Sequence, residues 1–477
     1  MDEAASPKPA EFRQVMVGLG LAMLLSALDQ TIVVTAMPTI GQELGDPQNL
    51  PLIVTSYLVA ATAVTPLDGK FAEVYGRRHV LAAGLIIFIF GSVACALAST
   101  MGLLAAARFL QGLGGGGLIS LAQTVIADLV TPRERGRYQT YFAAVFATTS
   151  IAGPVLGGFF AQYLHWSVIF WINAPLGLAA LYVINLRLKL LPQRRHPHHI
   201  DYFGASLLVI ASGALVLALG RLGGRFPWIS APILGLFGLS AVFWGVFIWR
   251  TWTFDEPLIP TRLFKLNIMR DAVISSALGL GAFVGLSVVM PIYFEGVIGL
   301  NPRDCGLALI PLMIATVIGA ACSGRIMAYR ADYKIMPVLG LLSAALAAFF
   351  FAWRLETLSF FGLNILFAIS TFGVGAMLPI ATVSVQNAVD MRDLGTATAA
   401  MQFFRQLGTA ALVALFGVLA LGGGRADLLD SPQDKAALIP AMIGSYRGVF
   451  FAIGLCLAFS CVFLAKMEER PLRGAPH

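Results

Sequence analysis

Long apolar runs recur along the whole chain, and short polar or charged segments separate them. One such run is "VLAAGLIIFIFGSVACALA", residues 80–98. A transmembrane helix needs about 20 consecutive, predominantly apolar residues. By that criterion the pattern predicts spans near residues 13–36, 50–70, 79–98, 101–129, 137–162, 166–188, 202–220, 231–250, 270–296, 305–328, 335–353, 357–385, 395–420 and 446–466. The pattern therefore indicates an all-α polytopic membrane protein with about 14 transmembrane helices.

The composition supports this interpretation. Of the 477 residues, 58% are hydrophobic and only 12% are charged, whereas soluble domains carry about 25% charged residues. The opening "MDEAASPKPAEFR" lacks the basic segment of a signal peptide, so we expect the first span to be an uncleaved anchor. The five cysteines show neither disulfide nor metal-ligand spacing, and we interpret them as packing residues.

Charge sets the predicted orientation. An even number of spans places both termini on one side, and Lys and Arg accumulate on the cytoplasmic side. Most of the 32 Lys and Arg residues fall on the side of the termini, in segments such as "GRRH", "TPRERGR", "LPQRRHPHH" and "RLFKLNIMR". We therefore expect a multi-pass protein of the cell (inner or plasma) membrane with both termini cytoplasmic. The net charge of +7 then reflects topology. No nucleic-acid partner is expected, because no basic patch is interleaved with exposed aromatics.

A degenerate sequence repeat suggests that the chain consists of two halves. "DGKFAEVYGRR" follows the second span, and "SGRIMAYRADYK" follows the tenth. Halves related by an axis along the membrane normal are typical of one large class of secondary transporters. The predicted organisation is a cytoplasmic N-terminal tail (1–12), an N-terminal six-helix bundle (13–188), a cytoplasmic linker with two extra transmembrane helices (189–269), a C-terminal six-helix bundle (270–466) and a cytoplasmic tail (467–477).

Charged residues within the apolar spans are the first candidate chemistry, because a charge at the bilayer centre costs about 2.5–3.5 kcal/mol on insertion scales. Asp29 lies in the outer half of span one and Arg108 in the outer third of span four. Both are about 11 Å deep at 1.5 Å per residue, so they could form a pair or face one cavity. An Asp whose surroundings change can switch protonation, as a proton-coupled carrier requires. The alternative is a fixed structural ion pair. Arg405, in span thirteen, is interpreted as packing or state-dependent pairing.

The cytoplasmic end of span two carries a second candidate site. Gly69 and Gly76 permit a tight turn and close packing, and Glu73 can pair with arginines or with a helix N-terminus. A salt bridge here would latch one conformational state. The alternative is the plain basicity of a cytoplasmic loop. The predicted latch comprises Asp68, Gly69, Lys70, Glu73, Gly76, Arg77 and Arg78.

Glycines in spans four and five predict close contacts between helices. In "RFLQGLGGGGLIS" Gly112 and Gly116 form a G-x-x-x-G face, and Gln111 shares a helical face with Arg108. The run lies in an apolar span with no strand before it, so its match to the dinucleotide pattern G-x-G-x-x-G is accidental. Span five, "SIAGPVLGGFF", repeats the glycine spacing around a proline that can kink the helix. We interpret its small residues as a hinge in a rocking interface: Gly153, Pro154, Gly157 and Gly158.

In combination these motifs resemble the major facilitator superfamily, specifically its fourteen-span drug:proton antiporter branch. The resemblance covers nearly the whole chain. It rests on "LDQTIVVTAMPTI", "GKFAEVYGRR", "RFLQGLGGGG", "AGPVLGG", "FWINAPLG", "GVGAMLPIATVSVQNAV" and "FFRQLG". It implies that the fold is of the major-facilitator type, with two six-helix bundles plus two additional central helices. It also implies that Asp29 is the proton or substrate site, Arg108 its relay partner, and Gly69, Glu73, Gly76 and Arg77 the conformational latch.

Three positions depart from the branch pattern. Asp68 stands where the branch usually has an uncharged residue, Glu295 where glutamine is common, and Ser167 where arginine is usual. We include Glu295 with Asp29 and Arg108 as a candidate proton or substrate residue, because added acids could change the proton stoichiometry or favour cationic cargo.

The predicted function is multidrug efflux, in which a proton-coupled antiporter exports hydrophobic or cationic small molecules by alternating access. One alternative is a dedicated exporter of a lipid or metabolite on the same fold. A polytopic membrane enzyme has less support, because no P-loop, H-E-x-x-H or acidic metal pair occurs. We expect no cofactor and no metal, with the proton gradient as the energy source. The segment "RRHPHH", residues 194–199, is interpreted as part of a solvated cytoplasmic loop. Residues 422–446 are interpreted as a long external loop. The partners are then small-molecule substrates, protons and the lipid bilayer, and we expect a monomer.

Overall fold

The computed structural model of the chain describes residues 9–46, 49–187, 201–221, 230–300, 305, 307–330, 332–357, 360–420 and 435–472. All regular structure in these residues is helical. Helices satisfy their own backbone hydrogen bonds, as a membrane-spanning segment must. Among the described residues, fourteen helices are long and apolar enough to cross a bilayer, which agrees with the predicted number of spans.

The N-terminal half, here called the N-half, contains six spans built from eight helices. Within it α1 packs on α6 and α8, and α4 packs between α2 and α3. The helices are α1 (Pro9–Glu43), α2 (Pro51–Tyr75), α3 (Arg77–Ala96), α4 (Met101–Gly115), α5 (Leu118–Leu129), α6 (Pro132–Tyr163), α7 (Val168–Trp171) and α8 (Asn173–Arg187).

The C-terminal half, the C-half, repeats this arrangement with six spans. Here α12 packs on α17 and α18, and α16 packs on α14 and α15. The elements are α12 (Asn267–Tyr293), the π-helical turn η3 (Phe294–Ile298), α14 (Ile310–Tyr329), α15 (Ile335–Arg354), α16 (Phe360–Ala388), α17 (Leu394–Ala420) and α18 (Lys435–Lys466). The contact of α1 with α6 thus corresponds to that of α12 with α17.

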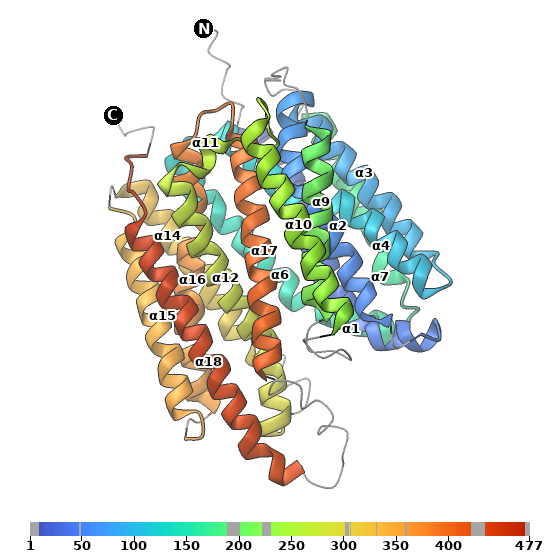
Figure 1. Cartoon of the computed structure of the whole chain (residues 1–477), viewed down its shortest axis with the longest axis vertical. Helices are drawn as coiled ribbons and strands as arrows, with labels where there is room; N and C mark the ends of the chain where they lie inside the picture. Colours follow the sequence, from blue (N-terminus) through green and yellow to red (C-terminus); the bar gives the residue numbers. More distant parts are fainter. Residues whose placement is uncertain are drawn as a thin grey trace.

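Two additional spans join the halves, as the fold prediction requires. They are α9 (Tyr202–Arg221) and α10 (Ala231–Thr253), followed by the short α11 (Thr261–Phe264). The two pack on each other, and α9 also contacts α2 and α17, beside the junction of the halves (Figure 1). The chain enters the bundle at α1 and leaves it at α18 on the same face, the upper one in Figure 1. We call it the termini face.

The structure corrects several predicted boundaries. The first span continues to Glu43 instead of ending at residue 36. Span four is two helices, because α4 ends and α5 begins around the glycine run at residues 114–117, where helix propensity is low. The last helix begins at Lys435, inside the predicted external loop 422–446. Residues 422–434 of that loop and the histidine segment 194–199 lie outside the described residues.

Candidate functional site

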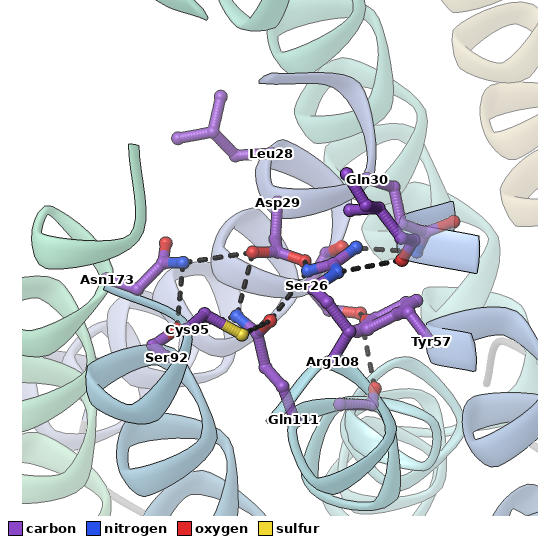
Figure 2. A network of polar contacts seen from close by, with 12 residues as sticks. Ser26, Leu28, Asp29, Gln30, Tyr57, Ser92, Cys95, Arg108, Gln111 and Asn173 are labelled. Atoms are coloured by element: carbon purple, nitrogen blue, oxygen red, sulfur yellow. Dashed lines mark hydrogen bonds and ion pairs between the residues drawn. The ribbon is translucent and has the colours of Figure 1, made fainter. Parts of the chain in front are cut away.

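Asp29 and Arg108, far apart in sequence, meet in the interior of the N-half (Figure 2). Arg108 Nη1 donates a hydrogen bond of 2.5 Å to Asp29 Oδ2. The exposed fractions are 0% for the aspartate and 1% for the arginine. Since two isolated charges would be very unfavourable at this depth, the close pair explains how both can be buried.

Two side-chain amides complete the coordination of the Asp29 carboxylate. Gln111 Nε2 donates to Asp29 Oδ1 at 2.8 Å, and Asn173 Nδ2 donates to the same oxygen at 3.0 Å. Both amides also donate to the hydroxyl of Ser92, at 2.5 and 3.0 Å. The carboxylate therefore receives donors from α4 and α8, held by a hydroxyl of α3 (Figure 2).

Sequence analysis did not identify Asn173, Ser92 or Tyr57 as members of this site. Asn173 stands in "FWINAPLG", a segment that contributed to the family resemblance but received no role. A polar residue at the start of an apolar helix was the available signal. Ser92 gave none, because serine is common in membrane helices.

The guanidinium of Arg108 has further partners besides the carboxylate. Its Nε donates to the Ile53 carbonyl at 3.2 Å, and its Nη1 is 2.6 Å from Gln111 Oε1. The Tyr57 ring lies 4.4 Å from the guanidinium carbon, within the range of a cation–π contact. Arg108 is thus held by α1, α2 and its own helix.

The span-four glycines bring α4 and its continuation against α2. A Cβ atom on Gly112 would lie 2.5 Å from the Tyr57 carbonyl oxygen, and one on Gly116 would meet the backbone of Ala61. Larger residues do not fit at this distance, so these two glycines allow the close approach that positions Arg108 next to α2. The predicted G-x-x-x-G contact is present, and its partner is α2.

The predicted hinge residues of α6 divide into two groups. Gly153 and Gly157 face α1, where a Cβ would meet Thr31 and the Ile32 carbonyl respectively. Gly158 has open space around it, and Pro154 is exposed. The helix continues through Pro154 from Pro132 to Tyr163. The tight interface with α1 therefore depends on Gly153 and Gly157 alone.

The loop after α2 is organised by arginines that bind within the N-half. Gly76 has φ +90°, a conformation that favours glycine, and it connects α2 to α3. Arg77 forms an ion pair with Asp128 at the end of α5 and donates to the Thr124 carbonyl at 3.1 Å. Arg78 donates to Asn185 Oδ1 of α8 at 3.3 Å.

Glu73 instead reaches across to the C-half. Its carboxylate accepts from Thr396 N and Thr396 Oγ1, both at 2.8 Å. Thr396 lies in the first turn of α17, where backbone N–H groups lack helical partners and favour an anion. Of the two pairings that the sequence allowed for Glu73, the structure contains the one with a helix N-terminus.

Close backbone contacts accompany this bond. Gly69 lies against Ala399 and Gly395 of α17, and Gly136 of α6 lies against Gly324 of α14. Both pairs sit near the termini face, at the end of α2 or the start of α6. The described inter-half contacts of these four helices thus bring the halves together on the termini side.

Asp68 and Lys70, the remaining predicted latch residues, do not take part in the Glu73–Thr396 contact. Asp68 is buried, and its carboxylate lies against Gly117 between α4 and α5. Lys70 is also buried. Neither forms an ion pair within 4.0 Å among the described residues. Glu295 belongs to η3, and its side chain lies outside the described part of the structure.

Arg405 is buried in α17, on the same helix as Thr396. One of its terminal nitrogens contacts Gln402 Oε1, and its buried Nε has no hydrogen-bond partner. Among the described residues, no hydrogen bond or ion pair joins it to Asp29 or Arg108.

Comparisons with known proteins agree on the type of molecule. The sequence model of the Major Facilitator Superfamily matches residues 19–413. An uncharacterized MFS-type transporter of Mycobacterium tuberculosis (strain ATCC 25618 / H37Rv) is 35% identical over 415 residues, which cover 86% of this chain but only 60% of that protein. Multidrug resistance protein 3 of Bacillus subtilis (strain 168) is 34% identical over 418 residues, covering 87% of this chain and 81% of the relative. The solved structure of the proton:xylose symporter XylE matches with a TM-score of 0.63 at 15% identity and covers 96% of each chain, which shows a shared fold.

Proposed function

Because this chain belongs to the Major Facilitator Superfamily, we propose that it is a proton-coupled antiporter that exports hydrophobic or cationic small molecules from the cell. The observation that carries the proposal is the fully buried carboxylate of Asp29, held by donors from two other helices. The multidrug transporters among the relatives support the class of cargo. The family and these relatives are transporters and not enzymes, which removes the membrane-enzyme alternative.

Asp29 is suited to carry the proton because its surroundings can serve both protonation states. The ionised carboxylate accepts hydrogen bonds from Arg108, Gln111 and Asn173. A protonated carboxyl group needs an acceptor instead, and Asn173 Oδ1 is a buried acceptor without a partner. Rotation of the Asn173 amide would present that oxygen to Asp29, while the Ser92 hydroxyl can donate or accept. The network thus offers a place for the proton. Protonation removes the negative charge that balances Arg108, whose remaining partners are the Ile53 carbonyl oxygen, Gln111 Oε1 and the Tyr57 ring.

Protonation would be transmitted through α1, which carries Asp29. The helix lies against α6 through Gly153 and Gly157, so a weaker bond to Arg108 would free α1 to shift along that contact. The halves meet at Glu73 and Thr396 on the termini face. With the termini cytoplasmic, as the positive-inside rule predicts, this structure is the state closed to the cytoplasm.

The energy source in this proposal is the proton gradient. The sequence contains no nucleotide-binding loop of the G-x-x-x-x-G-K-[ST] type. No resident cofactor is needed, because the proton itself is the co-transported species and Asp29 is its site.

The test uses purified protein in liposomes with an imposed pH gradient and a panel of hydrophobic and cationic dyes. Asp29→Asn keeps the side-chain shape but cannot ionise, so we expect it to abolish gradient-driven export. The matched control is Asp255→Asn, which changes an exposed acid. Undiminished gradient-driven export by the Asp29 variant would remove Asp29 as the coupling residue. Dye flux that does not depend on any imposed ion gradient would overturn the antiporter proposal. The same assay with lipid or metabolite cargo tests the dedicated-exporter alternative.

A further inference from the structure

Arg405 is a buried cation whose partners are incomplete. Its exposed fraction is 7%. Among the described residues no Asp or Glu lies within ion-pair distance of it. Within the described part of the chain its guanidinium hydrogen-bonds only to Gln402 Oε1, and Nε is buried without a hydrogen-bond partner. A guanidinium offers five N–H donors, so most of its capacity to bind an anion is unused.

A second unused donor lies on the same face of α17. The hydroxyl of Thr409 is buried and has no hydrogen-bond partner. Residues three and four apart share a helical face, so Gln402, Arg405 and Thr409 form one polar stripe. These three side chains carry two buried donors that have no hydrogen-bond partner among the described residues, and a buried unsatisfied donor is unfavourable.

The stripe begins with Gln402 on the side of α17 that contacts α2 and continues with Arg405 and Thr409 on the side that contacts α12. Thr396 and Gly395 mark the side that contacts α2 of the N-half, and Leu412 and Phe416 mark the side that contacts α12. Arg405 is nine residues beyond Thr396, or about 13 Å along the helix axis. It therefore lies deeper in the molecule than the Glu73–Thr396 contact, on the side of that contact away from the termini face.

We propose that Gln402, Arg405 and Thr409 form a binding site for the carboxylate of an amphipathic cargo molecule. This inference rests on the proposed export function and extends its cargo from hydrophobic and cationic molecules to hydrophobic carboxylates. The guanidinium fork matches a carboxylate with two parallel N–H···O bonds. Thr409 adds a hydroxyl donor one turn away. The surrounding span is apolar, which suits the hydrocarbon part of such a ligand.

The comparison with Arg108 shows what a complete set of partners looks like in this protein. Arg108 has a carboxylate, a carbonyl oxygen and an aromatic face. An uncompensated buried charge is unfavourable, and the described residues near Arg405 offer no carboxylate. The missing anion is therefore assigned to a ligand that enters the site during transport.

The experiment is an equilibrium titration of the full-length protein in detergent with two fluorescent probes. They are 11-(dansylamino)undecanoic acid and its methyl ester, which differ only in the charged group. For the unaltered protein we expect the acid to bind about tenfold more tightly than the ester, as hydrogen bonds between charged groups imply. In Arg405→Gln the acid should bind no better than the ester, while the affinity for the ester stays the same.

Two further variants keep the proposal testable if Arg405→Gln folds poorly. Thr409→Val removes only the hydroxyl and should weaken binding of the acid by about threefold. Arg405→Lys keeps the charge without the fork and should retain part of the preference for the acid. The matched control, Arg447→Gln, alters an exposed arginine that pairs with Glu356 and should change neither affinity.

Equal affinity for acid and ester in the unaltered protein would overturn the proposal. An equal loss for both probes in Arg405→Gln would also overturn it, because the arginine would then act through folding or conformation. The titration needs no proton gradient, so a failure of proton coupling would leave its result unchanged, and the two proposals can fail separately.

Discussion

The two halves meet at two equivalent contacts, and within the described residues only the α2–α17 contact contains a hydrogen bond to a charged side chain, here called the inter-half lock. At the α6–α14 contact the Thr140 hydroxyl donates to the Ala320 carbonyl oxygen at 3.5 Å. In the repeat, Gly69 of α2 corresponds to Gly324 of α14, and each lies against a glycine of the opposite half. Glu73 then bonds to Thr396, whereas the corresponding position of the C-half repeat is Ala328. Close backbone packing is thus common to both contacts, and the hydrogen bonds to a carboxylate are made by α2 of the N-half.

The C-half loop is held by its own half instead. Lys334 Nζ donates to the Ala465 carbonyl at 2.9 Å, and Tyr333 Oη donates to the Arg470 carbonyl at 3.0 Å. Glu469 accepts from Lys334 N at 3.2 Å. The segment after α18 therefore ties this loop to the C-half, as Arg77 and Arg78 tie the N-half loop to the N-half. The bond that joins the two halves comes from Glu73 near the end of α2. The comparison identifies the α2–α17 contact as the one whose carboxylate hydrogen bonds must break when the halves separate on this face, together with the longer Thr140–Ala320 bond.

The buried arginines show the same asymmetry in a second form. Arg108 of the N-half is fully partnered inside the protein, and Arg405 of the C-half is not. In the proposed mechanism, the first arrangement belongs to a site that switches by protonation. In the proposed carboxylate site, the second leaves a charge available to a ligand.

The largest expected effect separates the two arginines by stability. Arg108→Gln leaves the buried Asp29 carboxylate without its counter-charge and should cost about 3–5 kcal/mol. Arg405→Gln removes a charge that no carboxylate balances, so the unfolding midpoint should stay the same or rise. Thermal unfolding in detergent measures both. The double variant Asp29→Asn, Arg108→Gln should recover part of the loss, and equal midpoints for the two single arginine variants would contradict the comparison.

A smaller effect is expected at the inter-half lock. Glu73→Gln removes a charge-assisted bond worth about 1.5 kcal/mol, which shifts the balance toward separated halves by about tenfold. Spin labels at the exposed positions Tyr75 and Met391, with Cys322 and Cys456 replaced by serine, would report the distance between the halves. Glu356→Gln, at an exposed ion pair, should leave the distance distribution unchanged. An unchanged distribution in Glu73→Gln would show that the glycine contacts alone close this face.

The third effect concerns the equivalent helix pairs α1–α6 and α12–α17. A Cβ on Gly157 would meet the Ile32 backbone, which cannot yield, whereas one on Gly281 would meet the Leu412 side chain, which can. We expect Gly157→Ala to lower stability by about 1–3 kcal/mol and Gly281→Ala to lower it less. Gly158→Ala, in open space, should be neutral or stabilising by up to about 1 kcal/mol. Equal losses at residues 157 and 158 in a denaturation series would refute this division of the predicted hinge.

Much of the fold followed from sequence because the membrane makes simple demands. For the run at residues 202–220, the predicted bounds and those of the candidate span in the structure are the same, since a span must be long and apolar. The ends of helices were harder. The first span extends seven residues past its predicted end to Glu43, because polar residues outside the hydrocarbon core continue a helix without changing the apolar pattern. The break between α4 and α5 was missed for the related reason that glycines are tolerated within apolar spans.

The candidate site was predictable only where a charge drew attention to it. By itself the sequence determined the number of spans, the two buried charges Asp29 and Arg108, and the glycine spacings, because burial in lipid restricts which residues can stand there. Only the tertiary structure decided the partners. It brought Asn173 and Ser92 to the carboxylate of Asp29, turned Glu73 toward Thr396 instead of an arginine, and left Arg405 without an anion. Such contacts depend on which helices lie side by side, and the residue pattern along one helix does not specify which helices pack against it.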